Sequence, residues 1–352
     1  MDYMISEVAI SESGIESSDK SFKWLYDNSQ RVGMLFRDSI EEFYQNYIDS
    51  PDKMYRYVIN PEWAEASKNM RMRFTVLEID SDYVLIPLKM IDPIGHDRYF
   101  SLSMEPISYN RISDNEVKAV NIMKQFDCVK YIAVPELEVG DEVDNNYYNL
   151  PEDFKEMDRS KWRSKRGVNK LMQIVDFNPH AELIPGIEEQ VLTVNGIWDD
   201  IKMSKDKKLK LSKKTDQALA KLSLNNQSLY IYSFSYHEKM IGYSIAVIIL
   251  DKYIALLSTK QITNNYQALV DYIGEDTEEL QMIHRHLSSY MQYMIHKDAF
   301  QERGFHGVYN YGDTKIKGLK DFKLDYYAHR FSYNRYSLDD YLIRRNQIAE
   351  SV

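Results

Sequence analysis

Hydrophobic and polar residues recur with two different periods along the second half of the chain, and these periods predict its helices and strands. Residues 188–203 and 215–223 have the three- or four-residue spacing of amphipathic helices. Residues 228–261 alternate between apolar and polar positions and contain two polar turns, which predicts three antiparallel strands. Residues 276–304 return to helical spacing over a longer stretch, so we expect a long helix there.

The rest of this half completes a sheet of mixed direction. Residues 306–312 have the pattern of a strand, the residues after Gly312 that of a short helix, and residues 326–336 that of a last strand. Because a long helix separates residues 253–261 from residues 306–312, these two strands are expected to run parallel. A mixed sheet needs helices on both of its faces, so the pattern predicts an α/β fold class.

The first half repeats this order with weaker signals. Residues 21–49 have helical spacing, residues 74–80 and 83–92 predict a hairpin, and residues 113–127 predict a helix that is followed by a strand. The chain is therefore expected to contain two modules that divide near residue 150. The predicted parts are a flexible leader (1–20), an N-terminal module (21–150), a basic linker helix (151–173), a C-terminal module (174–336) and a C-terminal helix (337–352).

Composition limits the class of protein. The chain has 352 residues, a net charge of −10 and one cysteine, so it can form neither an internal disulfide nor a cysteine-based metal site. The longest apolar run, residues 241–250, is shorter than the ~18 residues that span a bilayer. The single thiol fits a reducing, cytoplasmic setting, and the N-terminus is acidic and rich in serine, unlike a secretion signal. Cys128 lies in a strand pattern and is expected to be a small core residue.

Two blocks of basic residues interrupt this acidic chain. Residues 155–170 carry seven basic residues against two acidic ones, and residues 202–214 carry seven lysines against one aspartate. Such blocks favour a local anionic partner, and the alternative is that both are solvated helix faces. The residues that we expect to bind a polyanion are Arg159, Lys161, Arg163, Lys165, Arg166 and Lys170.

A strand, a turn and a helix with two glycines follow the long predicted helix. The stretch VYNYGDTKIKGLKDFKLDY, residues 308–326, places Asn310 at the end of a strand and Gly312 where the chain turns. Gly318 inside a helix costs about 1 kcal/mol, and it would let the helix approach a ligand closely. Lys323 points either to such a ligand or to solvent. The alternative is an ordinary strand, turn and helix without a site.

The order of these segments resembles that of the GNAT acyltransferase superfamily. Three stretches carry the resemblance: RSKWRSKRGVNKL at 159–171, HEKMIGYSIAVII at 237–249, and the Asn-x-Gly and Gly-Leu-x-x-Phe-Lys pattern that begins at Asn310. Their order and spacing are similar to those of the two-module group that includes the FemAB-like and lysyl-phosphatidylglycerol-synthase-like proteins. The resemblance implies two tandem GNAT-like modules, of which the first is degenerate and the second is catalytic.

The resemblance also implies a reaction and the residues that carry it. Enzymes of this fold transfer an acyl or aminoacyl group directly to an amine acceptor, with no metal, in a crevice where two parallel strands part. By this likeness Asn310 and Lys323 are candidate catalytic residues. The tyrosine that often acts as general acid in the family comes about seven residues after the Asn, where this chain has Lys317, so Tyr311 and Tyr309 are the nearby candidates for that role. The residues implied to bind the donor or cofactor are Ser258, Thr259, Lys260, Gly312 and Gly318.

The donor loop of this chain departs from the family pattern. In the family, a glycine-rich loop between the third strand and the long helix holds a pyrophosphate. Here residues 258–280 contain a polar loop between the third strand and the long helix, with one glycine, Gly274, and acidic residues at the helix start. Acetyl-CoA and aminoacyl-tRNA both stay open as acyl donors.

Two other functions also stay open. One is a catalytically degenerate GNAT-like protein that binds nucleic acid through its basic blocks. The other is an enzyme of a bacteriophage type that modifies DNA bases, because the many Asn, Tyr, Lys and Ile residues are typical of an AT-rich genome.

Overall fold

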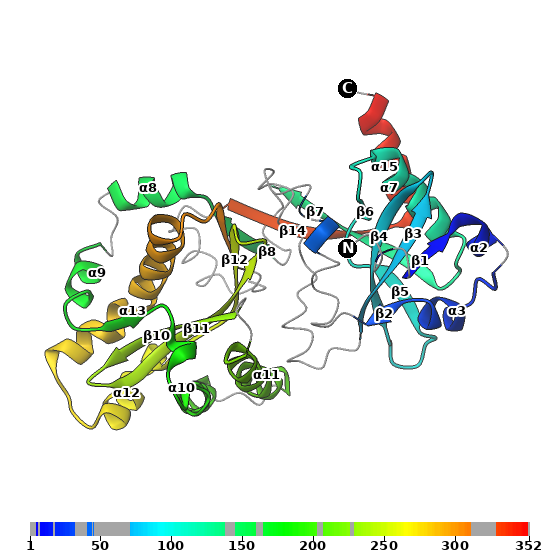
Figure 1. The fold of residues 1–352 in the computed structure, drawn as a ribbon. Helices are drawn as coiled ribbons and strands as arrows, with labels where there is room; N and C mark the ends of the chain where they lie inside the picture. The colour runs from blue at the N-terminus through cyan, green and yellow to red at the C-terminus, as the bar shows by residue number, and fades with distance from the viewer. Residues whose placement is uncertain are drawn as a thin grey trace. The chain divides into compact units, whose positions relative to one another are not determined.

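The structure is a computed structural model that describes residues 5, 8–16, 18–31, 41–43, 45, 71–137, 145–159, 165–202, 207–225, 229–310 and 329–350. Unit 1, one of two compact units, consists of Met1–Val143 and Phe331–Val352, and unit 2 consists of Asp144–Arg330 (Figure 1). Both contain helices and strands of mixed direction, so the predicted α/β class is confirmed. The described helices include none with the length and apolar character of a membrane span.

Unit 1 consists of a sheet with helices packed against it. Its strands are β1 (Ala9–Ser11), β2 (Gln30–Arg31), β3 (Met72–Ile79), β4 (Asp82–Ile91), β5 (Tyr99–Leu102), β6 (Ile107–Ser108), β7 (Val129–Leu137) and β14 (His329–Ser337). Its described helices are α2 (Glu12–Glu16), α3 (Phe22–Asp27), α7 (Ser113–Lys124) and α15 (Leu338–Glu350).

The sheet of unit 1 has the strand order β1-β3-β4-β5-β7-β14, with β2 beside β3 and β6 beside β4. The strands β3, β4 and β5 pair antiparallel, β5 runs parallel to β7, and β7 pairs antiparallel to β14. The helices α7 and α15 pack on this sheet over a core that includes Phe100, Val120, Ile132 and Tyr341.

Unit 2 contains the segments that the sequence pattern predicts most clearly. Its strands are β8 (Asn145–Asn149), β9 (Asp176–Asn178), β10 (Leu229–Tyr236), β11 (Lys239–Ile249), β12 (Tyr253–Gln261) and β13 (Gly307–Asn310). Its described helices are α8 (Pro151–Arg159), α9 (Lys165–Leu171), η2 (Ala181–Leu183), α10 (Ile187–Lys202), α11 (Lys207–Ser223), η3 (Ile262–Asn264), α12 (Tyr266–Ile273), α13 (Glu278–Lys297) and the π-helical turn η4 (Asp298–Glu302).

The sheet of unit 2 has the strand order β8-β13-β12-β11-β10-β9. The strands β10, β11 and β12 pair antiparallel, as predicted, and the turn at His237 and Glu238 has positive φ at both residues, which suits a tight hairpin. The predicted parallel pair is also confirmed, since β12 and β13 align from Tyr253 with Gly307 to Leu256 with Asn310.

The two sheets share one order of strands. The last strand of each sheet comes from the other half of the chain: β14 joins the sheet of unit 1, and β8 joins the sheet of unit 2. In each unit three antiparallel strands are followed by a helix and a parallel strand, β7 in unit 1 and β13 in unit 2. The next neighbour is antiparallel: β14 pairs with β7, and β8 pairs with β13. The C-terminal residues 331–352 therefore belong to unit 1, whereas the sequence pattern assigned residues 326–336 to the C-terminal module. The order of strands along the chain does not reveal that β8 and β14 are exchanged between the two sheets. A strand can pair with any sheet edge that is open, whichever half of the chain that sheet comes from.

Helices cover both faces of the unit 2 sheet. A Cβ atom on Gly242 of β11 would lie 2.9 Å from the Met291 sulfur of α13, so α13 covers that face. The hydroxyl of the next residue, Tyr243, donates a hydrogen bond to Asp216 of α11 on the opposite face. Successive residues of a strand point to opposite faces, so residue parity on β11 tells which helix a side chain meets.

The predicted polar loop before α13 contains a helix instead. Asn265 caps α12 by accepting hydrogen bonds from the backbone of Gln267 and Ala268, and Gly274 ends it with φ at 94°. Thr277 caps the following helix α13, because its side chain accepts a hydrogen bond from the Leu280 backbone.

Candidate functional site

A β-bulge interrupts β12 just after its parallel pairing with β13 ends. Leu256 lies opposite Ala246 and Ser258 lies opposite Ile245, which leaves Leu257 without an opposite residue in β11. The extra residue reverses the alternation of side chains along β12. Leu256 therefore shares the α13 face, whereas Ser258 and the later residue Lys260 lie on the face of α10 and α11.

The pairing between β12 and β13 stops before β12 itself ends. The last paired residues are Leu256 and Asn310, and β12 continues to Gln261. Among the described residues, no strand pairs with this edge of β12 beyond Leu256. The side chains of residues 257–261 are only partly buried. The predicted parting of the two strands beyond this point falls on residues 311–328, which lie outside the described residues.

A buried carboxylate from α11 lies against the bulged part of β12. Asp216 is 2% exposed, and its Oδ2 accepts hydrogen bonds from the Tyr243 hydroxyl at 2.6 Å and from Ser258 Oγ at 3.0 Å. The ammonium group of Lys260 lies 3.9 Å from the same oxygen. A buried charge is costly unless it is paired and hydrogen-bonded, and these donors meet that need.

The ammonium group of Lys260 is also held by an aromatic ring. Its Nζ lies 4.6 Å from the centre of the Trp198 ring of α10, at a distance typical of a cation–π contact. Thr259 points to the other face, where its hydroxyl lies 2.8 Å from Ser244 Oγ. Of the three residues predicted to bind the donor on β12, Ser258 and Lys260 therefore share one environment and Thr259 has another.

Asp216 is a site residue that lies outside the sequence-based predictions. The signal was present, because Asp216, Leu219, Ala220 and Ser223 form the buried stripe of α11 at helical spacing. A carboxylate in an otherwise apolar or small-residue stripe calls for a buried partner, and that partner is found on the sheet. The prediction of a helix over residues 215–223 used only the spacing of the apolar residues and did not use the aspartate among them.

The remaining predicted catalytic residues lie on β13 or after it. Tyr309 is 1% exposed, and its ring packs 5.7 Å from that of Tyr253 and 5.8 Å from that of Tyr148. This environment is that of a core aromatic residue. Asn310 is partly buried at the end of β13. The predicted residues that lie outside the described part of the chain are Tyr311, Gly312, Gly318 and Lys323.

The predicted polyanion site is partly described. Arg166 and Lys170 are exposed on α9, whereas Lys165 donates a hydrogen bond to the Asp158 carbonyl. The helix α9 packs on α13, where His286 lies so close to Gly167 that an added Cβ would be 2.4 Å from the ring. Burial lowers the pKa of His286, and the charges of Arg285 and Lys170 lower it further. The side chain of Arg159, and Lys161 and Arg163 altogether, lie outside the description.

Cys128 lies in the turn just before β7 and is only partly buried, whereas the sequence pattern predicts a core residue within the strand. It packs against the core of unit 1, and burial raises the pKa of its thiol to about 11. The thiol is therefore protonated at neutral pH, which makes it a poor nucleophile.

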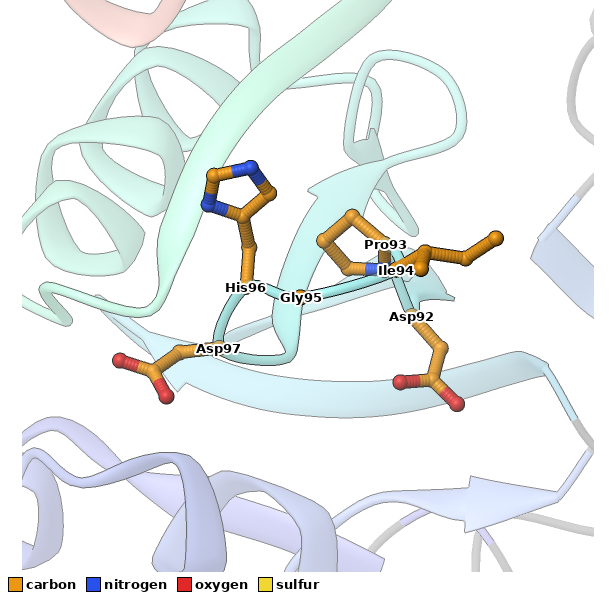
Figure 2. A pocket seen from close by; sticks show the side chains of 6 residues that line it. All are labelled: Asp92, Pro93, Ile94, Gly95, His96 and Asp97. Carbon is orange, nitrogen blue, oxygen red and sulfur yellow. The ribbon is translucent and has the colours of Figure 1, made fainter.

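The β4–β5 loop of unit 1 borders an open hollow, shown in Figure 2, that is lined by Asp92, Pro93, Ile94, Gly95, His96 and Asp97. The His96 ring points away from the two carboxylates, and these also point apart. Asp92 is in addition paired with Arg98 at 3.2 Å. The polar groups of this loop thus do not converge on a common ligand.

Comparison with known proteins supports the fold. No family model and no curated protein matches the chain. Its structure is similar to a conserved protein of unknown function from Bacteroides thetaiotaomicron, with a TM-score of 0.52 and 11% identity over 87% of this chain and 98% of that one. This score shows a shared fold over most of the chain.

Two further solved structures are similar at lower scores. One is the DUF2156 C-terminal domain of a protein described as a lysylphosphatidylglycerol synthetase from Agrobacterium fabrum, with a TM-score of 0.44 and 8% identity over 89% of this chain and 96% of that one. The other is a tandem GNAT protein from the clavulanic acid biosynthesis pathway, with a TM-score of 0.40 and 7% identity over 88% of this chain and 98% of that one. Each unit has the strand order that the GNAT-like resemblance of the sequence predicts, with three antiparallel strands, a helix and a strand parallel to the third.

Proposed function

We propose that the protein is a GNAT-type N-acyltransferase that transfers an acyl or aminoacyl group directly to an amine. The observation that carries the proposal is the bulge at Leu257, directly after the last parallel pair of β12 and β13. A bulge leaves backbone polar groups outside the regular ladder. Fixed backbone donors of this kind can polarise an acyl carbonyl where negative charge develops.

Unit 2 is the proposed catalytic module. Its strand β12 extends beyond the last parallel pair at Leu256 to Gln261, and Ser258, Thr259 and Lys260 on this extension are proposed to contact the donor. The corresponding strand of unit 1, β5, ends at Leu102, which is also its last residue paired with β7. Unit 1 therefore offers no equivalent extension, which supports the proposal that it is the degenerate module.

The acyl donor is proposed to be an aminoacyl-tRNA in preference to acetyl-CoA. The helix α12 occupies the chain between β12 and α13 where the family has its pyrophosphate loop, and Glu278 and Glu279 form the first turn of α13. Carboxylates at a helix start compete with a bound phosphate. An aminoacyl donor would agree with the FemAB-like and lysyl-phosphatidylglycerol-synthase-like resemblance.

A direct assay tests this function. The full chain is incubated with acetyl-CoA or with aminoacyl-tRNA, together with a panel of primary amines, and new amides are detected by mass spectrometry. We expect an amide from the aminoacyl donor that depends on both protein and amine. Amide formation from acetyl-CoA alone would contradict the donor assignment, and no amide from either donor would contradict the proposed function.

Exposed cations on α9 favour a second function, the binding of a nucleic acid. Arg166 and Lys170 lie on the solvent side of α9, and Arg285 is exposed on α13, the helix that α9 contacts. Contacts between cations and phosphates release counterions, so the affinity should fall as salt rises. We expect the combined Arg166→Ala and Lys170→Ala variant to reduce the slope of log affinity against log salt by about 2 for duplex DNA.

A matched control for this measurement is Lys221→Ala, which removes another exposed cation, on α11. The slope should then stay close to that of the wild type. A binding affinity that does not change with salt, or an equal loss in both variants, would exclude α9 as the binding surface.

A further inference from the structure

The carboxylate of Asp216 is connected to the surface of unit 2 through a short series of polar groups. Asp216 is 2% exposed and Tyr243 is fully buried, whereas Ser258 and Lys260 are only partly buried. Of the three groups described around Asp216 Oδ2, only the last two can therefore also meet a substrate. Lys260 carries a positive charge and has no lone pair to receive a proton. Ser258 Oγ can both donate to Asp216 and accept from a ligand.

Ser258 lies next to the bulge, so the series of polar groups that ends at Asp216 begins beside the proposed position of the acyl carbonyl. Ser258 follows Leu257, and the bulge is what turns it to the face of α11. Its hydroxyl therefore lies one residue from the backbone that is proposed to polarise the acyl carbonyl. An amine that attacks that carbonyl must come within about 3 Å of the acyl carbon. Its proton is then released close to the bulge, within reach of the Ser258 hydroxyl.

We propose that Ser258 is a catalytic residue that relays the proton of the attacking amine to Asp216, which acts as a positioning residue behind it. This inference rests on the function proposed above. The amine nitrogen forms a bond to the acyl carbon, and its proton passes to Ser258 Oγ while the proton of Ser258 passes to Asp216 Oδ2. The bond from the acyl carbon to the sulfur or oxygen of the donor breaks, and the proton returns through Ser258 to that leaving atom. The amide and the protonated leaving group are the only products.

The neighbouring groups suit this role. Tyr243 donates to the same oxygen as Ser258 and keeps the carboxylate turned toward β12. The Lys260 ammonium at 3.9 Å stabilises the negative charge of Asp216 between turnovers. The Trp198 ring in turn holds Lys260 in place. The carboxylate is thus fixed before the substrate arrives.

The test measures kcat and KM from acidic to basic pH for the wild type, Ser258→Ala, Asp216→Asn and Tyr243→Phe, with the donor and amine that give the highest turnover. We expect Ser258→Ala and Asp216→Asn to lower kcat by about 100-fold or more at neutral pH, as loss of general base catalysis does. The KM for the donor should stay within about threefold in Asp216→Asn, since Asp216 lies buried behind Ser258 and has no proposed contact with the donor. The rates of both variants should keep rising with pH where the wild-type rate has levelled off.

Tyr243→Phe is the matched control, because it removes a hydrogen bond to the same Asp216 oxygen and leaves the proton path intact. We expect it to lose less than about tenfold in kcat and to keep the wild-type pH profile. An equal loss in Tyr243→Phe and Asp216→Asn would show that Asp216 only clamps the two strands. If Asp216→Asn does not fold, Ser258→Ala decides alone, since it removes one partly buried hydroxyl.

Failure of this inference can be told apart from failure of the proposed function. A wild-type chain that transfers the acyl group, with Ser258→Ala retaining the wild-type pH profile, overturns the relay and leaves the transferase. A wild-type chain that neither binds nor turns over either donor in a calorimetric and product assay overturns both.

Discussion

Deleting Leu257 is expected to lower acyl transfer by about 100- to 1,000-fold while the strands β11 and β12 stay paired. The deletion removes only the residue that has no partner, so Ile245 would still lie opposite Ser258 and Ala246 opposite Leu256. A regular ladder would then replace the bulge, and its backbone groups would bond to β11. The range is the known cost of losing one donor to a developing oxyanion. Transfer rates and thermal unfolding measured on the same samples would check it.

The substitution Leu257→Ala is the control for this deletion. It keeps the extra residue and therefore the bulge, and it shortens a side chain that is only partly buried. We expect it to retain transfer within a few-fold of the wild type. If the deletion variant folds and transfers at the wild-type rate, the bulge has no part in catalysis and the proposal loses its main support.

The stability of unit 2 is expected to fall by about 3 kcal/mol between pH 7 and about pH 4 because of one buried histidine. His296 is 3% exposed at the end of α13, and burial lowers its pKa from 6.5 to about 4. Its Nδ1 lies 2.6 Å from the Gln292 carbonyl oxygen and its Nε2 lies 3.1 Å from Asn149 of β8. The hydrogen bond to Gln292 offsets only part of the effect of burial.

The sign follows from proton binding. Between the folded value near 4 and the unfolded value of 6.5, the unfolded chain binds a proton at residue 296 and the folded chain does not. The free energy of unfolding therefore decreases as the pH falls through this window. Urea unfolding at several pH values would show a steeper pH dependence for the wild type than for His296→Gln.

The control for this measurement is His237→Asn. His237 is exposed in the β10–β11 turn, and asparagine tolerates its positive φ of 47°. This variant should keep the pH dependence of the wild type. If His296→Gln keeps it as well, the burial of His296 does not govern the acid sensitivity of unit 2.

Several parts of the fold follow from local sequence signals. Residues 228–261 alternate clearly and contain short turns, so their three strands are predictable. The parallel partner of β12 is also predictable, because a strand, a long helix and a strand in one sheet make a crossover. The helix α12 could have been predicted too, since Asn265, Leu269, Ile273 and Gly274 provide a cap, an apolar spacing and a stop. The polar residues between them led to the prediction of a loop.

The candidate site was predictable only in part. The sequence pointed to Ser258 and Lys260 through a family resemblance, and the structure places both beside the bulge. It gave no reason to connect them with Asp216, which is more than forty residues away in the chain. A contact at this separation depends on how α11 packs against the sheet, and the periodicity of α11 alone does not contain that information.

Periodicity and turn chemistry, acting over a few residues, determined the helices, the three antiparallel strands and the α/β class of this protein. The tertiary structure alone decided the exchange of β8 and β14, because an open sheet edge can accept any strand that reaches it. It also decided the bulge at Leu257, since one unpaired residue leaves the sequence pattern almost unchanged. That one residue nevertheless reverses which face each later side chain of β12 occupies, and so it brings Ser258 and Lys260 to Asp216.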